Sequence, residues 1–249
     1  MDPRLEIWAL VSRYILLRYF LIAGGTFIFL YFILYRFGFL KKLQTKLPPW
    51  RSVLLEIWNS SLTIILFSLA ATSVLFLFQE RTLIYQDKNE YGLLYYYLSF
   101  PIMFLMHDTY FYWVHRLMHN PSIFRYVHKV HHRSTNPTPF ASYSFHVLEG
   151  VLEAAILPLI AFTLPVHREA LILFLLLQFI YNVYGHTGFE IYPRWLLRTW
   201  VGKWINTSVA HNMHHKYFNG NYGLYFLFWD RWMGTLDSRY EEAFKSRKV

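Results

Sequence analysis

The sequence lacks cysteine altogether, which excludes a disulfide framework and any metal site built on thiolates. Charged residues are also scarce: Asp, Glu, Lys and Arg make up 16% of the 249 residues, against about 25% in an ordinary soluble domain. No glycine-rich G-x-G-x-x-G fingerprint occurs, so a dinucleotide-binding fold of that kind is not expected. Internal repeats and low-complexity linkers are absent as well, which predicts a single domain over residues 1–249.

Apolar and aromatic residues are abundant in place of charge. Hydrophobic residues make up 55% of the chain and aromatic residues 21%, with 23 Phe, 20 Tyr and 9 Trp. This composition is typical of a protein packed against lipid, with aromatic rings at the membrane interface. The formal net charge is +9, but the basic residues flank apolar runs instead of following one polar face. We therefore expect a membrane-embedded protein without a nucleic-acid partner.

Three apolar runs predict membrane segments. They cover residues 14–35, interrupted only by Arg18, then residues 57–78 and residues 92–106. Five Lys and Arg residues lie between positions 36 and 51, whereas the loop after the second run holds two. The positive-inside rule then places the first loop in the cytoplasm. Residues 1–13 lack the pattern of a cleavable signal peptide, so the first run is expected to remain as an anchor.

Eight of the twelve histidines fall into three short clusters. These clusters are His115-x3-His119, His128-x2-His131-His132 and His211-x2-His214-His215. Residues three and four positions apart share one face of a helix, so each cluster is expected to point its imidazoles at one place. Two copies of the H-x2-H-H pattern are very improbable by chance at this histidine content. Eight imidazoles exceed the four ligands of one zinc ion and suit a pair of transition-metal ions, whether zinc, iron, copper or nickel.

A fourth apolar region is divided in two and predicts a helical hairpin. Residues 154–166 and 170–184 are each shorter than the roughly 20 residues of a full span, and His167, at the expected tip, is predicted to be an interfacial residue. Pro158 and Pro165 are expected to kink the first half. Because histidine clusters precede and follow this region, it must leave and re-enter on the same side. The predicted fold is an all-α integral membrane protein with about four transmembrane or re-entrant helical segments and a cytoplasmic histidine-rich cap that holds two metal ions.

From Phe100 onward the chain resembles the superfamily of membrane fatty acid hydroxylases and sterol desaturases. The histidine clusters carry this resemblance, the first of them within His107-Asp-Thr-Tyr-Phe-Tyr-Trp-Val-His115-Arg-Leu-Met-His119. Two further stretches are most similar to the C-5 sterol desaturases, or lathosterol oxidases. These stretches are Thr138-Pro-Phe-Ala-Ser-Tyr-Ser-Phe-His146 and Asn221-Tyr-Gly-Leu-Tyr-Phe-Leu-Phe-Trp-Asp230-Arg231. The resemblance implies an N-terminal membrane anchor region over residues 1–91 and a hydroxylase-like catalytic region over residues 92–249.

The resemblance implies nine metal ligands and no catalytic side chain beyond them. The implied ligands are His115, His119, His128, His131, His132, His186, His211, His214 and His215. Some relatives carry a further histidine four residues before His186, where this chain has Asn182, which could ligate weakly or hold a water. Six residues are expected around the ligands, and the acidic ones among them are expected to accept hydrogen bonds from ligand N–H groups. These six are His107, Asp108, His146, Glu149, Asn182 and Asp230.

The resemblance also implies two iron ions, O2 and electrons from NAD(P)H through an external carrier such as cytochrome b5 or a ferredoxin-like protein. It implies an active site on the cytoplasmic side, in the endoplasmic reticulum of a eukaryote or the inner membrane of a bacterium. The expected reaction is desaturation or hydroxylation of a sterol or sterol-like lipid, in a channel lined by residues that flank His115 and by the hairpin of residues 154–184.

Two other functions are compatible with the same histidines. A hydroxylase of fatty acyl, sphingoid or carotenoid chains would need the same metal centre. The stretch Val147-Leu148-Glu149 is compatible with such a hydroxylase, because C-5 sterol desaturases carry Pro-Val-Asp at these positions. A zinc-binding membrane protein without enzymatic activity is less expected, since transporters place ligands within their spans near the midplane.

Overall fold

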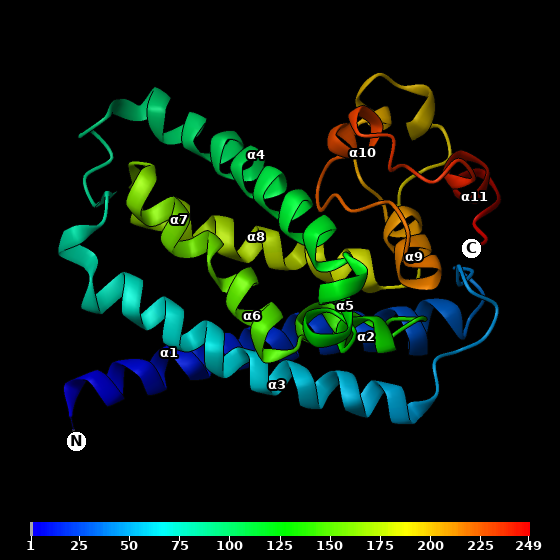
Figure 1. Ribbon diagram of the computed structural model, residues 1–249, viewed down its shortest axis with the longest axis horizontal. Helices are drawn as coiled ribbons and strands as arrows, with labels where there is room; N and C mark the ends of the chain where they lie inside the picture. The colour runs from blue at the N-terminus through cyan, green and yellow to red at the C-terminus, as the bar shows by residue number, and fades with distance from the viewer. Residues whose placement is uncertain (1) are drawn as a thin grey trace.

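The computed structural model describes residues 2–249 and is built mainly of helices (Figure 1). The helices are α1 (Pro3–Tyr19), α2 (Gly25–Phe27), α3 (Trp50–Thr72), α4 (Gly92–Met118), α5 (Pro121–Val127), α6 (Val147–Ala154), α7 (Ile156–Thr163), α8 (Arg168–His186), α9 (Ser208–Tyr217), α10 (Phe228–Trp232) and α11 (Tyr240–Ser246). Wider π-helical turns at Phe20–Gly24, Ile28–Tyr35 and Ser73–Leu77 join and extend the first helices. The first helical rod therefore runs from Pro3 to Tyr35 and the second from Trp50 to Leu77.

Three helices within the described chain are long and apolar enough to cross a membrane. They are Pro3–Tyr35, Trp50–Leu77 and Arg168–His186. The first two contain the predicted runs 14–35 and 57–78. The third predicted run, residues 92–106, forms the first part of α4, which is not among the three because several tyrosines and the polar residues from His107 onward lower its hydropathy. The third helix that is long and apolar enough to cross a membrane is α8, the second half of the predicted hairpin.

The chain turns back at the two ends of the molecule (Figure 1). α1 and α3 pack side by side in opposite directions, and α4 packs against α8. The N-terminus, residues 79–91 and the turn before α8 lie at one end. Residues 36–49, the segment between α5 and α6, and everything after α8 lie at the other end, with the C-terminus. All three histidine clusters consequently meet at this second end, as the sequence required.

The predicted hairpin is present, with α6 and α7 running out and α8 running back. Its first half is broken at Ala155, because Pro158 has no N–H to donate to the carbonyl of Ala154. α7 ends at Thr163, just before Pro165. The proline effects predicted from the sequence are thus confirmed.

A short parallel pairing fixes the tip of this hairpin. Strand β1 (Ile84–Tyr85) pairs with strand β2 (Val166–His167). His167 accepts the Glu169 N–H at the start of α8, and its Nε2 lies 2.8 Å from the carbonyl oxygen of Gln86. The side chain of His167 is buried and ties the tip to the preceding loop, while its predicted position at the membrane interface stays a prediction.

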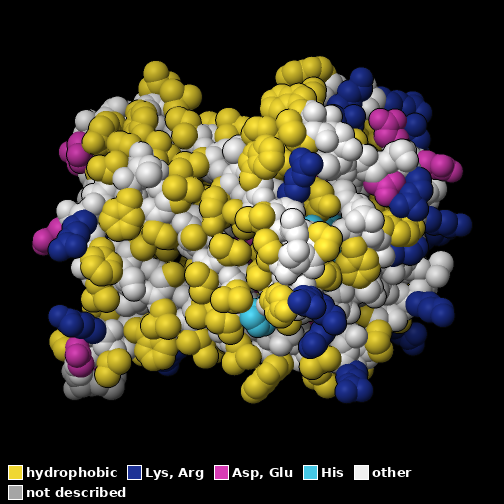
Figure 2. Space-filling model, viewed as in Figure 1, with side chains coloured by type: hydrophobic (Ala, Val, Ile, Leu, Met, Phe, Trp, Pro, Cys, Tyr) yellow, Lys and Arg dark blue, Asp and Glu magenta, His cyan; other side chains and the backbone are white. Residues whose placement is uncertain are grey.

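The surface divides into an apolar body and a basic end. Figure 2 shows hydrophobic side chains over most of the visible face, while Lys and Arg side chains gather toward the end that holds the C-terminus. In the apolar body, large hydrophobic side chains of α1, α3, α4 and α8 are exposed on the surface of the protein. A soluble protein rarely exposes so much contiguous apolar surface, so these faces are suited to contact with lipid.

Candidate metal centre

Nine histidines converge at the basic end of the molecule in two adjoining sets, and they are the nine that the sequence singled out. The first set contains His115, His119, His128, His132 and His214. The second set contains His131, His186, His211 and His215. Within each set, the candidate ligand atoms all lie within 4.8 Å of one another.

Each H-x2-H-H cluster contributes to both sets, which corrects the expectation that a cluster points at one place. On α9, His211 and His215 face the second set and His214 faces the first. The pair His131 and His132 is divided in the same way. Neighbouring residues of a helix point about 100° apart, whereas residues four positions apart share a face. One H-x2-H-H cluster can therefore supply two centres at once.

The spacing of the imidazole nitrogens fits a central ion in each set. In the first set, Nε2 atoms lie 3.0 Å apart between His115 and His128 and 3.2 Å apart between His119 and His214. In the second set, the Nε2 of His186 lies 3.0 Å from that of His211. Metal–nitrogen bonds of about 2.0–2.1 Å place neighbouring ligands about 2.9–3.4 Å apart. The observed distances agree with this range.

In six histidines the hydrogen-bond partner of Nδ1 shows that Nε2 carries a lone pair. The Nδ1 atoms of these six face acceptors: Tyr222 O for His115 (2.9 Å), Ser144 O for His131 (3.3 Å), Asn182 O for His186 (2.8 Å), Gly220 O for His214 (2.7 Å), Ser134 O for His215 (2.9 Å) and Glu149 Oε1 for His128 (2.7 Å). A neutral imidazole has one N–H, which these acceptors require at Nδ1. The Nε2 atoms of these six then cannot hydrogen bond to one another, and a cation in each set would satisfy their lone pairs.

Burial keeps these imidazoles in the neutral form that binds metal. Burial lowers the pKa of His214 to about 4, despite the hydrogen bond to Gly220. The pKa of His215 is also well below its ordinary value, through burial and then the neighbouring imidazoles of His131 and His211. At neutral pH the site therefore offers uncharged ligands, and its donor set fits two transition-metal ions.

Among the acidic residues expected beside the ligands, Glu149 alone contacts one. Its Oε1 lies 2.7 Å from Nδ1 of His128, and both side chains are fully buried. Glu149 occupies the third position of α6, and His146 caps this helix by accepting the Leu148 N–H through Nδ1. His146 itself reaches no ligand, so its contribution is to the start of the helix that carries Glu149.

Asp108 and Asp230 act on a loop instead of on histidines, contrary to the prediction. Asp108 Oδ1 accepts from the backbone N–H groups of Leu224, Tyr225 and Phe226, at 3.2, 2.6 and 3.1 Å. Asp230 accepts from the N–H groups of Tyr222 and Gly223, at 2.9 and 2.8 Å. The same loop offers the carbonyls that orient His115 and His214. The two carboxylates therefore position the ligands through the backbone of residues 220–226.

His107 and Asn182 lie beside the centre without belonging to either set. Nδ1 of His107 is 2.8 Å from the hydroxyl of Tyr225. The side-chain amide of Asn182 donates to the carbonyl of Ser142 (2.9 Å), while its backbone carbonyl orients His186. Asn182 is thus a supporting residue in this structure, and the two sets of ligands consist of histidine alone.

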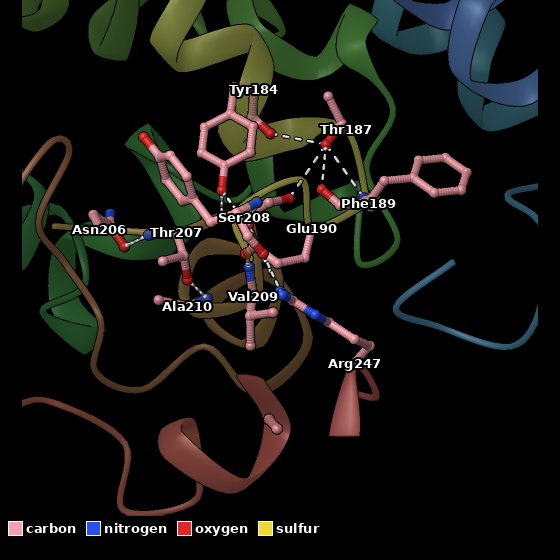
Figure 3. A network of polar contacts seen from close by, with 12 residues as sticks. Tyr184, Thr187, Phe189, Glu190, Asn206, Thr207, Ser208, Val209, Ala210 and Arg247 are labelled. Atoms are coloured by element: carbon pink, nitrogen blue, oxygen red, sulfur yellow. Dashed lines mark hydrogen bonds and ion pairs between the residues drawn. The ribbon is translucent and has the colours of Figure 1, made fainter. Parts of the chain in front are cut away.

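A polar network that the sequence did not reveal anchors α9 to the end of α8 (Figure 3). The carboxylate of Glu190 accepts the hydroxyl of Tyr184 (2.6 Å) and the backbone N–H of Val209 (3.1 Å). The Tyr184 hydroxyl in turn accepts the N–H of Ser208 (3.1 Å). A carboxylate at the N-terminus of a helix also complements the helix dipole. This network sets the distance between His186 on α8 and the three histidines of α9.

An apolar cavity of about 490 Å³ lies between α1, α3 and the hairpin, and none of the nine clustered histidines lines it. It passes beside the second histidine set at Phe145, whose ring centroid lies 5.1 Å from that of His131, and at Asn182, whose backbone carbonyl orients His186. The hairpin lines it as expected. The residues that flank His115 do not, because α1 and α3 form the opposite wall instead. This volume is in the range of pockets that hold a small lipid-sized ligand.

Comparison with known proteins agrees with this geometry. The family model for fatty acid hydroxylase matches residues 100–235. The chain belongs to the fatty acid hydroxylase family. A Delta(7)-sterol 5(6)-desaturase of Aspergillus fumigatus is 33% identical over 239 residues, which are 85% of this chain and 72% of the relative. No solved structure matches the chain.

Other relatives align with this chain over shorter regions. A Delta(7)-sterol 5(6)-desaturase of Gibberella zeae is 35% identical over 156 residues, or 62% of this chain and 46% of the relative. Lathosterol oxidase of Homo sapiens is 32% identical over 180 residues, or 72% of this chain and 56% of the relative. The chain thus spans about half the length of several curated relatives. All nine clustered histidines lie within the family match, whereas α1 and α3, which close the cavity, lie before it.

Proposed function

We propose that this chain is a membrane oxidoreductase that desaturates a sterol or sterol-like lipid, with two iron ions and O2. The observation that carries the proposal is an apolar cavity beside two all-histidine ligand sets, with Phe145 of the cavity wall packed against His131 of the second set. The relatives named as sterol 5(6)-desaturases and as lathosterol oxidase support a sterol as the substrate class.

The chemistry calls for an oxidising cofactor, because an unactivated C–H bond offers side chains no acidic or electrophilic handle. Two iron ions, one in each histidine set, would supply the activation of O2 and the removal of hydrogen. In the overall reaction the lipid loses two hydrogen atoms. With two electrons and two protons from an external source, O2 and these hydrogens become two molecules of water.

The protein's own groups would orient ligands, seat the lipid and exclude water. Glu149 and the backbone carbonyls hold the imidazoles with Nε2 turned inward. Phe145 packs on His131 where the cavity meets the centre, so an apolar chain can approach without bulk solvent. Such exclusion of water protects reactive species from side reactions.

The basic end of the molecule supports a cytoplasmic orientation and an external electron donor. Lys and Arg side chains gather at the end that carries the histidines (Figure 2). By the positive-inside rule this end would face the cytoplasm, in the endoplasmic reticulum of a eukaryote or the inner membrane of a bacterium. A donor with an acidic face, such as cytochrome b5 or a ferredoxin-like protein carrying electrons from NAD(P)H, would be steered to it.

Hydroxylation of a lipid chain is the second candidate function. The family match to fatty acid hydroxylases and the Val147-Leu148-Glu149 sequence favour it. Both reactions use the same centre and cavity and differ in whether a second hydrogen is removed or oxygen is inserted.

Product analysis tests the proposal. The purified, iron-loaded protein in lipid nanodiscs is supplied with O2, reduced cytochrome b5 or ferredoxin, and a Delta(7)-sterol, and the sterols are analysed by mass spectrometry. A product lighter by two hydrogens, absent with His131→Ala, is expected. A product heavier by one oxygen would favour the hydroxylase, and an unchanged sterol with every donor would contradict the sterol assignment.

A further inference from the structure

Polar side chains interrupt the wall of the apolar cavity. Most of the wall is aliphatic or aromatic, but Arg18, His107, Glu153, Arg168, Gln178 and Asn182 also line it. A polar group on the wall of an apolar lipid cavity is costly unless it has a partner. Gln178 and Asn182 donate to the carbonyls of Leu175 (3.3 Å) and Ser142 (2.9 Å). Beside these two amides, Glu153 is the side chain that calls for an explanation.

Their places in the helices put them beside the histidines. Glu153 follows Glu149 by four residues, so both lie on one face of α6, and Glu149 is the group that holds His128. Gln178 precedes Asn182 by four residues on α8, and the carbonyl of Asn182 holds His186. α6 and α8 thus present polar side chains to the cavity about one helical turn from groups that touch the ligands.

Glu153 is the charged wall residue without a partner. Arg18 donates to the Tyr143 hydroxyl (2.9 Å) and to the carbonyl of Leu175 (3.2 Å). Arg168 lies over the ring of Phe76, at 5.5 Å. For the Glu153 carboxyl, residues 2–249 provide neither a hydrogen bond nor an ion pair. Its capacity to hydrogen bond is directed into the cavity and remains available to a bound molecule.

We propose that Glu153, supported by Gln178 and Asn182, binds the hydroxyl group of the substrate, so that the lipid enters with its hydroxyl end toward the metal centre. This inference rests on the proposed function and adds the orientation and the recognition of the substrate. In a sterol, one methylene group separates the hydroxyl-bearing carbon from the nearer carbon of the 5(6) bond. A centre that oxidises the 5(6) bond must therefore have the hydroxyl close by, where these three side chains lie.

The remainder of the cavity suits the rest of such a molecule. Its wall there is mostly apolar, with Leu10 and Val11 of α1, Phe76 of the π-helical turn after α3, and Ile172 of α8, and Arg168 lies over the ring of Phe76. The rings and the aliphatic tail of a sterol would extend into this part. A fatty acyl chain hydroxylated far from its head group would have no use for a hydrogen-bonding carboxyl beside the centre.

Binding measurements on the metal-loaded protein in nanodiscs, with no electron donor present, test the inference apart from turnover. Equilibrium binding of a tritiated Delta(7)-sterol, with competition by its unlabelled parent and by the methyl ether of its hydroxyl, is compared among wild type, Glu153→Gln and Glu153→Met. Wild type should prefer the free hydroxyl about tenfold or more, the scale of a hydrogen bond to a carboxyl. Glu153→Gln should keep most of this preference and Glu153→Met should bind both compounds alike. Glu242→Leu, at an exposed position of α11, is the control and should match wild type.

Equal binding of sterol and ether by wild type would overturn the inference, even if Glu153→Met failed to fold. An undiminished preference in a folded Glu153→Met would also overturn it. The proposed function fails differently, since it requires conversion of the sterol by the iron-loaded wild type. A protein that prefers the hydroxyl but converts no sterol would retain the binding site and lose the desaturase assignment.

Discussion

The two ring nitrogen atoms have different roles in six of the nine histidines of the candidate metal centre. In six residues Nδ1 donates to a carbonyl or carboxylate, and Nε2 is turned inward with its lone pair. Histidines are ordinarily fixed in this way when they bind metals, because the outer hydrogen bond selects the tautomer and the ring orientation. The residue types and spacing predicted the ligands, but the acceptors are mostly backbone carbonyls, which no sequence pattern marks.

Removing one histidine from either set is expected to release metal. His131→Ala and His214→Ala delete one ligand of the second and the first set, respectively. Each variant should retain about one metal ion per chain or fewer, where wild type holds two, because the remaining ligands bind more weakly. Elemental analysis by mass spectrometry of the purified proteins measures this. His146→Asn preserves a helix cap outside the centre and should keep both ions; a fully loaded His131→Ala or His214→Ala would contradict the ligand assignment.

The carboxylate of Glu149 is expected to strengthen metal binding through His128. Glu149→Gln keeps the shape of the side chain but replaces a charged acceptor 2.7 Å from Nδ1 with a neutral amide. Changes of this kind typically cost about 10–100-fold in metal affinity. Competition with a chelator should reveal the loss, whereas Glu242→Gln should behave as wild type. Identical retention of metal in Glu149→Gln would show that the contact does not act on the ligand.

At the scale of elements, the centre depends on loops and helix ends as much as on the histidine-bearing helices. The loop of residues 220–226 orients His115 and His214, and Asp108 and Asp230 hold its backbone. The sequence predicted both carboxylates near the site but not their indirect role, since that role depends on a loop conformation. It did predict which histidines converge, but not that adjacent histidines of one cluster are divided between two sets.

Gly220 is expected to be sensitive to substitution because of this loop. Its φ is +76°, and a Cβ there would lie 2.2 Å from the carbonyl oxygen of Thr235. Gly220→Ala should lower the free energy of unfolding by about 1–2 kcal/mol through backbone strain, with about 1–3 kcal/mol more from the clash. The displaced carbonyl should also loosen His214 and reduce bound metal.

A second glycine, Gly234, separates the effect of backbone strain from the effect of the clash. Gly234 also has a positive φ, of +67°, but a Cβ there would meet nothing within 4 Å. Gly234→Ala should therefore show only the strain, with metal content unchanged. Thermal or denaturant unfolding of both variants, with metal analysis, measures the difference; equal effects at the two positions would contradict a special role for the loop.

At the scale of the whole molecule, the arrangement separates an apolar body from a basic end that carries the metal centre. The apolar runs 14–35 and 57–78 predicted most of the rods of residues 3–35 and 50–77, and the divided run predicted the hairpin of α6, α7 and α8. They did not predict that α4 is less apolar than a typical membrane-spanning helix, because of its tyrosines and its polar second half. Nor did they reveal the cavity, because α1 and α3 meet the hairpin only through contacts between distant parts of the chain.

The absence of native cysteine makes the orientation directly measurable. Thr45→Cys and Ser238→Cys lie at exposed positions of the histidine end, and Asn89→Cys lies at an exposed position of the opposite end. In sealed vesicles, a membrane-impermeant thiol reagent should label the first two from one side and the third from the other. Labelling of all three from the same side would contradict a body that crosses the bilayer between its two ends.

The central claim is that two adjoining metal ions are held by histidine alone. X-ray absorption spectroscopy of the purified, metal-loaded protein tests it most directly, because it reports the atoms bound to the metal. We expect a first shell of imidazole nitrogen, at about 2.0–2.2 Å for transition-metal ions, with only solvent-derived oxygen besides, and two ions per chain. A first shell dominated by carboxylate oxygen, or a single ion per chain, would contradict it.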